Sequence, residues 1–136
     1  MFVDASALTA ILVREDDFEA LLDILEASPL RIVSPVVVFE TVAAVARIRA
    51  VPPSEAERIV REAIVELGLE LRPISTAASP LVQDAFARYG KGQGHPAQLN
   101  MGDCFSYACA RHFDVPLLFK GKDFSQTDIP DALKVR

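Results

Sequence analysis

A helical pattern leads into the pattern of a strand and a turn at residues 100–124, NMGDCFSYACARHFDVPLLFKGKDF. Residues 100–113 are almost wholly small or apolar and predict a helix that packs against other elements. Residues 115–119 form the short apolar run of a buried strand, and the turn signals of 121–124 follow at once. A helix that leads directly into a buried strand is typical of a parallel sheet with helical connections.

The same alternation extends through the rest of the chain. Phe18, Leu21 and Leu25 recur at helical spacing, which predicts an amphipathic helix. Strands that alternate with helices in one short chain indicate an α/β fold with a central parallel sheet covered by helices on both faces. The expected strands are 1–3, 30–33, 69–74 and 115–119, and the expected helices are 16–27, 35–48, 54–67, 78–89 and 100–113.

Local signals mark several helix ends. Ser34 followed by Pro35 predicts an N-cap and a first-turn proline for the helix over 35–48. Ser54 and Glu57 have the spacing of a capping box, and Gly68 stands where the helix over 54–67 should end.

The length and composition are those of one globular domain. The chain has 136 residues, of which 51% are hydrophobic, so we expect a single domain over 1–136 rather than disorder. The formal net charge of −5 argues against a broad basic surface that coats nucleic acid. No apolar run reaches the roughly 20 residues of a membrane span, and Met1 leads into the first strand without a basic region. We therefore expect a cytoplasmic protein that does not enter a membrane.

The two cysteines, Cys104 and Cys109, are predicted to be buried packing residues. On one helix they would be separated by about 7.5 Å of axial rise, which is too far for a disulfide. Their spacing is also wrong for a zinc site. Free thiols fit a reducing compartment.

Two carboxylates follow predicted strands. Asp4 comes directly after the first strand, and Asp123 lies in the turn after the last one. In folds with parallel sheets, ligands bind beyond the carboxyl ends of the strands. Taken singly, either residue could instead cap a helix or form a turn.

Two further carboxylates lie on apolar helices. Glu40 projects from a stripe of valines and alanines, and Asp103 opens a helix that is otherwise small or apolar. A carboxylate that faces the core needs a cation, a metal ion or a proton. Arg47, two turns from Glu40, offers a structural ion pair instead, and the helix dipole favours an acid such as Asp103 in a first turn.

Together the four acids predict a metal site. Carboxylates that converge repel one another unless a divalent cation lies among them. Oxygen ligands without a His or Cys cluster favour a hard ion, Mg²⁺ or Mn²⁺. Such a site typically handles phosphates.

Five segments resemble the PIN-domain ribonucleases and, within them, the VapC-type toxins of bacterial toxin-antitoxin pairs. Their order and spacing carry the resemblance, which covers essentially the whole chain. The segments are 1–7 (MFVDASA), 34–41 (SPVVVFET), 99–108 (LNMGDCFSYA), 116–124 (PLLFKGKDF) and 127–129 (TDI).

This resemblance implies a PIN-like three-layer α/β/α sandwich and a Mg²⁺-dependent ribonuclease, with Mn²⁺ able to replace Mg²⁺. In the family, the residues that match Asp4 and Asp103 touch the metal, and those that match Glu40 and Asp123 hold water or a second ion. The supporting positions are Ser6, Asn100 and Asp128, of which Asp128 is an alternative to Asp123 as the fourth acid.

The resemblance also implies partners. They are an RNA substrate, a small VapB-like antitoxin with a basic residue for the acidic cleft, and a second copy of the chain in a homodimer. The candidate contacts to the RNA backbone are Lys91, Lys120, Lys122 and Arg47.

Other functions are left open by the sequence. A PIN-like binding module could keep the acids without catalysis. A Mg²⁺-binding receiver domain would need a second acid beside Asp4 and an acceptor after the third strand, where residues 73–76 are Pro-Ile-Ser-Thr. A metal-independent ribonuclease could use His95 and His112 as an acid-base pair.

Overall fold

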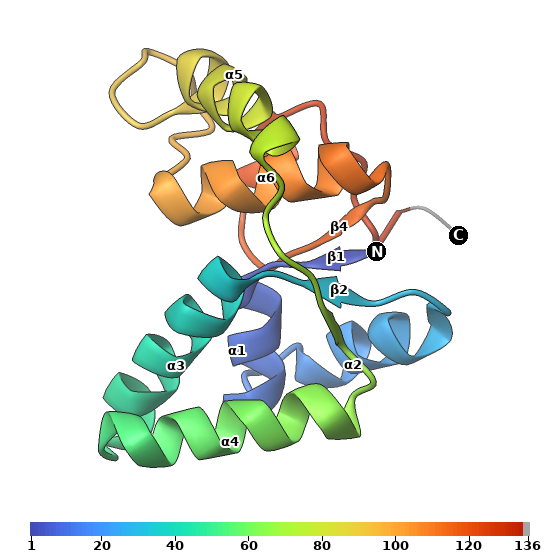
Figure 1. The fold of residues 1–136 in the computed structure, drawn as a ribbon, viewed down its shortest axis with the longest axis vertical. Helices are drawn as coiled ribbons and strands as arrows, with labels where there is room; N and C mark the ends of the chain where they lie inside the picture. The colour runs from blue at the N-terminus through green and yellow to red at the C-terminus, as the bar shows by residue number, and fades with distance from the viewer. Residues whose placement is uncertain (135–136) are drawn as a thin grey trace.

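A four-stranded parallel sheet forms the centre of the protein (Figure 1). The structure is a computed structural model that describes residues 1–134, so the last two residues of the predicted domain lie outside the described residues. The strand order is β3-β2-β1-β4, and each neighbouring pair is parallel. The strands are β1 (Phe2–Val3), β2 (Ile32–Val33), β3 (Glu70–Leu71) and β4 (Leu117–Leu118).

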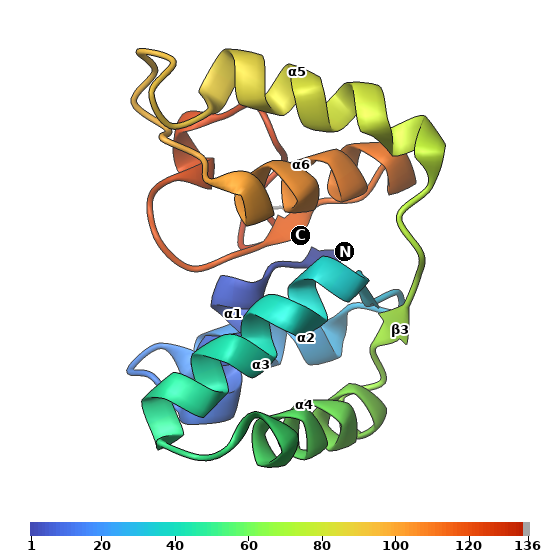
Figure 2. The ribbon, with the colours of Figure 1, turned by 60° about the vertical axis from the view of Figure 1, so that its left-hand side comes forward.

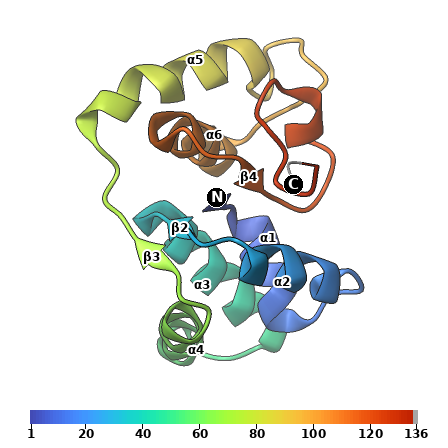
Figure 3. The same ribbon diagram turned by 90° about the vertical axis from the view of Figure 1, so that its right-hand side faces the viewer.

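Helices cover both faces of this sheet, which confirms the predicted α/β/α layers. Figures 1 and 3 show α5 and α6 on one face and α1 to α4 on the other. Figure 2 shows α5 lying along α6. The helices are α1 (Ala5–Val13), α2 (Phe18–Ala27), α3 (Pro35–Arg49), α4 (Pro53–Glu66), α5 (Ser79–Tyr89) and α6 (Met101–Phe113), with short 3₁₀ helices η1 (Thr76–Ala78) and η2 (Phe124–Gln126).

The sequence pattern does not predict α1, which the structure shows over Ala5–Val13. Six of its nine residues are buried, and its sequence, ASALTAILV, has no polar face. Helical periodicity shows in a sequence only where one side meets water, so a helix enclosed on most sides gives little signal. Asp4 caps this helix, because its side chain accepts a hydrogen bond from the backbone N–H of Ser6.

The predicted helix ends are right in part. Ser34 caps α3 by accepting from the N–H of Val37 at 3.3 Å. The expected capping box at Ser54 is wrong: α4 begins one residue earlier, at Pro53, and has no side-chain cap. Proline needs no N–H partner in a first turn, so it can open the helix itself. Gly68 follows the end of α4 with φ at +61°, as a terminating glycine should.

The two inner strands fix the position of the candidate site. β1 and β2 are completely buried. The backbone N–H of Asp4, directly after β1, donates to the carbonyl of Leu118 in β4 at 2.9 Å. The first acid is therefore held at the carboxyl end of the central strands.

The edge strand β3 is shorter than predicted. Glu70 and Leu71 are both exposed, and the expected strand over 69–74 is reduced to these two residues. Among residues 1–134, no helix is long and apolar enough to cross a bilayer.

Candidate active site

Three of the four predicted acids line one cleft at the carboxyl ends of the strands. The cleft has a volume of about 350 Å³. Asp4 enters it from the end of β1, Glu40 from α3, and Asp103 from the first turn of α6. Segments that are far apart in the sequence thus bring three carboxylates to one cleft.

Asp4 is the most rigidly held of the three. Its side chain is 3% exposed. One oxygen, Oδ2, accepts from the N–H of Ser6 at 3.0 Å and from its hydroxyl at 2.6 Å, and Oδ1 accepts from the hydroxyl of Ser106 at 2.5 Å. Three donors fix the orientation of the carboxylate before any ligand binds.

Ser106 is a site residue that the sequence reading missed. It lies three positions after Asp103 on α6, and helical spacing places residues i and i+3 on the same side. That spacing was the available signal. A serine on an apolar helix more often bonds its own backbone, so the contact to Asp4 needs the folded structure to show it.

Ser6 joins the site to the segment after β4. Its hydroxyl donates to Asp4 and accepts from the backbone N–H of Lys120 at 3.0 Å. The loop that leaves β4 is therefore attached to the first acid through one hydroxyl.

Glu40 is half-buried beside the other two acids. Burial, together with the smaller effect of the charges of Asp4 and Asp103, raises the pKa of Glu40 to about 7. Among the described residues, Glu40 forms no ion pair with Arg47, so the structural ion pair considered from the sequence is absent.

Gly102 makes room for the Glu40 carboxylate. A methyl group at Gly102 would overlap all three carboxyl atoms of Glu40. The glycine lies in the first turn of α6, next to Asp103, and is itself buried. Its missing side chain lets α3 and α6 approach closely at the cleft.

Asp103 both caps α6 and faces the cleft. Asn100 and Asp103 form a capping box, in which each side chain accepts from the other's backbone N–H, at 2.8 and 3.1 Å. The pKa of Asp103 is raised to about 6, chiefly by burial and less by the charges of Asp4 and Asp123, while the hydrogen bond from the Asn100 backbone acts in the opposite direction. Asp103 therefore both caps the first turn of α6 and lines the acidic cleft.

The donor set fits a hard divalent cation. The cleft presents carboxylate oxygens. Burial and, to a smaller extent, mutual repulsion raise the pKa values of Glu40 and Asp103, and a bound cation would stabilise their ionised forms. Among residues 1–134, no three His, Cys, Asp or Glu side chains close around one point as a finished metal cage. The acids form an open cluster rather than a closed one.

The comparisons with known proteins agree with this geometry. Residues 1–130 match the family model of the PIN domain. The chain belongs to the PIN domain family.

Curated relatives place this PIN domain in the VapC group. A VapC ribonuclease of Rhizobium meliloti is 42% identical, over 94% of this chain and 98% of the relative. Ribonuclease VapC42 of Mycobacterium tuberculosis is 38% identical, over 97% of this chain and 98% of the relative. Both alignments cover nearly the full length of each protein.

A solved VapC structure shares the fold of this PIN domain. It is VapC20 of Mycobacterium tuberculosis, described as a toxin that cleaves the sarcin-ricin loop. The TM-score is 0.73 at 15% identity, and the match covers 94% of this chain and 95% of VapC20.

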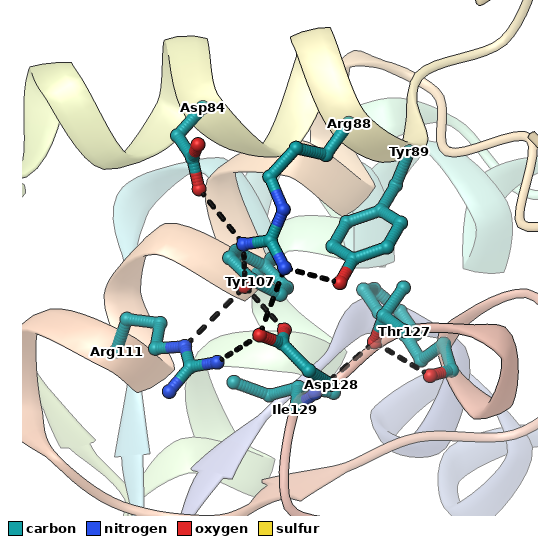
Figure 4. A network of polar contacts seen from close by, with 9 residues as sticks. Asp84, Arg88, Tyr89, Tyr107, Arg111, Thr127, Asp128 and Ile129 are labelled. Carbon is teal, nitrogen blue, oxygen red and sulfur yellow. Dashed lines mark hydrogen bonds and ion pairs between the residues drawn. The ribbon is translucent and has the colours of Figure 1, made fainter.

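The two candidates for the fourth acid of the PIN domain lie in different surroundings. Asp123 is exposed in the turn after β4, and its charge acts on Asp103. Asp128 accepts hydrogen bonds from Tyr107 at 2.5 Å and Arg88 at 3.0 Å, and it forms an ion pair with Arg111 at 2.7 Å (Figure 4). Asp128 thus lies within a cluster of cations, while Asp123 is the acid whose charge reaches the cleft.

These partners also set the charge of Asp128. Burial acts to raise its pKa, but the hydrogen bonds from Tyr107, Arg88 and Arg111 outweigh burial and hold the pKa of Asp128 well below its usual range. Asp128 is therefore an ionised anchor between α5, α6 and the segment after η2.

The predicted basic residues of the PIN domain are dispersed. Arg47 and Lys120 line the acidic cleft, but the ammonium group of Lys120 pairs with Glu15 and Asp17. Lys122 is exposed on the turn before Asp123. The remaining candidate, Lys91, lines a separate pocket beside α5.

The histidines and cysteines play no part in the cleft. His95, in the loop before α6, packs its ring on Tyr89, while His112, in the last turn of α6, packs on Phe113. They lie near opposite ends of α6, so no acid-base pair forms. Cys104 and Cys109 are buried free thiols, as predicted.

Proposed function

We propose that this protein is a Mg²⁺-dependent endoribonuclease, the toxin of a toxin-antitoxin pair. The observation that carries the proposal is the convergence of Asp4, Glu40 and Asp103 in one cleft, with pKa values of about 7 and about 6 for Glu40 and Asp103. Relatives at 42% and 38% identity are named VapC ribonucleases, which supports RNA as the substrate.

The surroundings of each carboxylate indicate a different proposed role. Asp4 and Asp103 are the proposed metal ligands, since Asp4 is fixed by three donors and Asp103 by its capping bond. A bound Mg²⁺ would polarise the scissile phosphate and lower the pKa of a coordinated water. Ser6 and Ser106 hold Asp4 in one orientation, so less reorganisation is needed when the phosphate arrives.

Glu40 and Asp123 are the proposed second pair. Glu40 would orient the attacking water, since a carboxylate with a pKa near 7 suits proton transfer at neutral pH. Asp123 lies in the exposed turn after β4, and its charge acts on Asp103. It would add a carboxylate for water or a second ion. Arg47, which lines the same cleft, is the proposed cation for the RNA backbone.

Three further expectations from the family remain part of this proposal. We infer a VapB-like antitoxin that covers the acidic cleft with a basic residue, a homodimer, and a cytoplasmic setting. Mn²⁺ should replace Mg²⁺, because both are hard ions that take oxygen ligands.

Cleavage of cellular RNA by the purified protein tests the proposal. Mg²⁺ should support cleavage and a chelator should stop it, and mapping of new 5′ ends should find sites that are absent with Asp4→Ala. A folded protein that binds Mg²⁺ tightly but cuts no RNA would instead support the catalytically silent binding module.

A further inference from the structure

A second hollow flanks the acidic cleft. It has a volume of about 510 Å³ and lies between α5, the loop after α5, and the first turn of α6. Asn100 lines both the hollow and the acidic cleft. We call it the α5–α6 pocket and note that its volume lies in the range of small-ligand sites.

The walls of the α5–α6 pocket are apolar and aromatic. Phe86 of α5 is 48% exposed and Met101 of α6 is 74% exposed, although both are large apolar side chains. Phe105, one turn after Met101, is a second aromatic wall. Exposed aromatic and thioether groups around a hollow are typical of a surface that binds something.

The pocket is formed before any ligand binds. The ring of Phe86 packs so closely on Gly90 that a side chain at Gly90 would collide with it. Two backbone bonds of 2.8 Å close the loop after α5, from Leu99 N–H to the carbonyl of Tyr89 and from Lys91 N–H to the carbonyl of Leu99. The backbone of Lys91 is therefore held beside the Phe86 wall.

The polar groups of the pocket suit an anion with a flat apolar body. Lys91 is the one charged residue that lines it, and no described acid does. Gln83 and Asn100 add side-chain amides, which both donate and accept hydrogen bonds. Asn100 uses its oxygen to cap α6, which leaves its NH₂ group without a partner among the described residues.

We propose that the α5–α6 pocket binds one unpaired nucleobase of the RNA, with Lys91 at the phosphate of that nucleotide. The inference rests on the proposed function, because continuity through Asn100 places this base next to the phosphate in the acidic cleft. Aromatic and thioether walls take the faces of a base, and the amides take its edge. An apolar side chain from a protein would leave Lys91 and the amides unmatched.

Methionine methyl NMR tests the pocket without any cleavage. The chain has two methionines, of which Met101 lines the pocket and Met1 is buried in a different hollow. With ¹³C-methyl methionine and a chelator present, AMP or UMP at millimolar concentration should shift the Met101 signal and leave Met1 unchanged. Ribose 5-phosphate, which has the phosphate but no base, should shift neither signal.

Variants sharpen the test. Phe86→Ala removes one wall of the pocket and should weaken the apparent affinity for AMP about tenfold, since base–aromatic stacking contributes on that scale. Val65→Ala is the matched control, because Val65 is 77% exposed on α4 and lines neither hollow. It should leave the affinity unchanged.

The other outcomes distinguish the proposed base pocket from its alternatives. An equal response to ribose 5-phosphate would show a phosphate site only, and an equal response to N-acetyl-leucinamide would show a site for protein side chains. A Met101 shift that depends on protein concentration alone would show a second copy in the pocket. RNA cleavage without any response of Met101 to nucleotides would overturn the base pocket and leave the nuclease intact, whereas a Met101 response without cleavage would support the pocket and overturn the proposed function.

Discussion

The backbone of Gly102 lies directly against the carboxylate of Glu40, so the first turn of α6 and the middle of α3 approach at the acidic cleft. This contact ties the helix that carries Asp103 to the helix that carries Glu40.

Gly102→Ala is expected to displace the Glu40 carboxylate at a cost of at most about 1 kcal/mol in stability, because that carboxylate is the far end of a flexible side chain. RNA cleavage should fall as well, since Glu40 must move. Chemical denaturation and initial cleavage rates measure the two effects.

A second background makes this test specific. In a Glu40→Ala protein the obstacle is gone, and Gly102→Ala should stabilise by up to about 1 kcal/mol, because alanine favours a helix over glycine. If the substitution costs the same in both backgrounds, Glu40 does not explain the glycine.

Ser106→Ala should destabilise the protein by about 1–3 kcal/mol. The substitution removes the 2.5 Å bond to Oδ1 of Asp4 and leaves a buried carboxylate oxygen without that donor. Thermal unfolding in a chelator measures the loss. Ser125→Ala is the control, because the hydroxyl of Ser125 bonds an exposed backbone carbonyl, and an equal effect of the two variants would show that the contact to Asp4 has no special weight.

The metal-free protein should lose stability as pH rises from about 4 to about 7. The pKa values of Glu40 and Asp103 are raised in the folded state, to about 7 and about 6, so the folded protein binds more protons than the unfolded chain in this window. Their favourable contribution is complete below the unfolded pKa and is lost as pH passes through the folded pKa.

Mg²⁺ should restore stability at pH 8 and do little at pH 5, where the two carboxyls are largely protonated. Thermal unfolding with and without Mg²⁺ measures this difference. Glu40→Gln should flatten the pH dependence, whereas Glu66→Gln, at an exposed position of α4, should leave it unchanged. A Mg²⁺ effect that is equal at both pH values would contradict the assignment.

Asp123→Asn and Asp128→Asn should separate catalysis from stability. Asp123→Asn should reduce RNA cleavage tenfold or more with little change in unfolding, since Asp123 is exposed and its charge reaches Asp103. Asp128→Asn should lower the unfolding free energy by about 1 kcal/mol, because it weakens a partly exposed network with two arginines, and should leave cleavage within severalfold. The reverse pattern would make Asp128 the fourth acid.

Most of the fold followed from patterns that depend on neighbouring residues alone. The run over 115–119 and the cap at Ser34 were readable because burial and capping leave local signatures. The enclosed helix α1 was not, because periodicity disappears where no side meets water. The proline at position 53 opened α4 in place of the expected cap, since a missing N–H carries no cost there.

The candidate site shows the same division. Glu40 was found because a carboxylate on an apolar stripe is conspicuous in sequence, whereas the hydroxyl of Ser106 is ordinary until the fold sets it against Asp4, 102 positions away. The pairing of Lys120 with Glu15 likewise joins distant segments. Contacts of this kind depend on how the layers pack, which no local pattern records.

RNA cleavage in Mg²⁺ by the unaltered protein, Asp103→Asn and Asp114→Asn tests whether the acidic cleft is a carboxylate-metal site. Asp103 and Asp114 lie at opposite ends of α6, and both variants remove one negative charge. Asn suits the left-handed backbone of Asp114, where φ is 54°, so this control should fold and cut RNA at an unchanged rate. Asp103→Asn should remain folded and lose at least a hundredfold in Mg²⁺-dependent cleavage. Equal cleavage by all three proteins would contradict a carboxylate-metal site in this cleft.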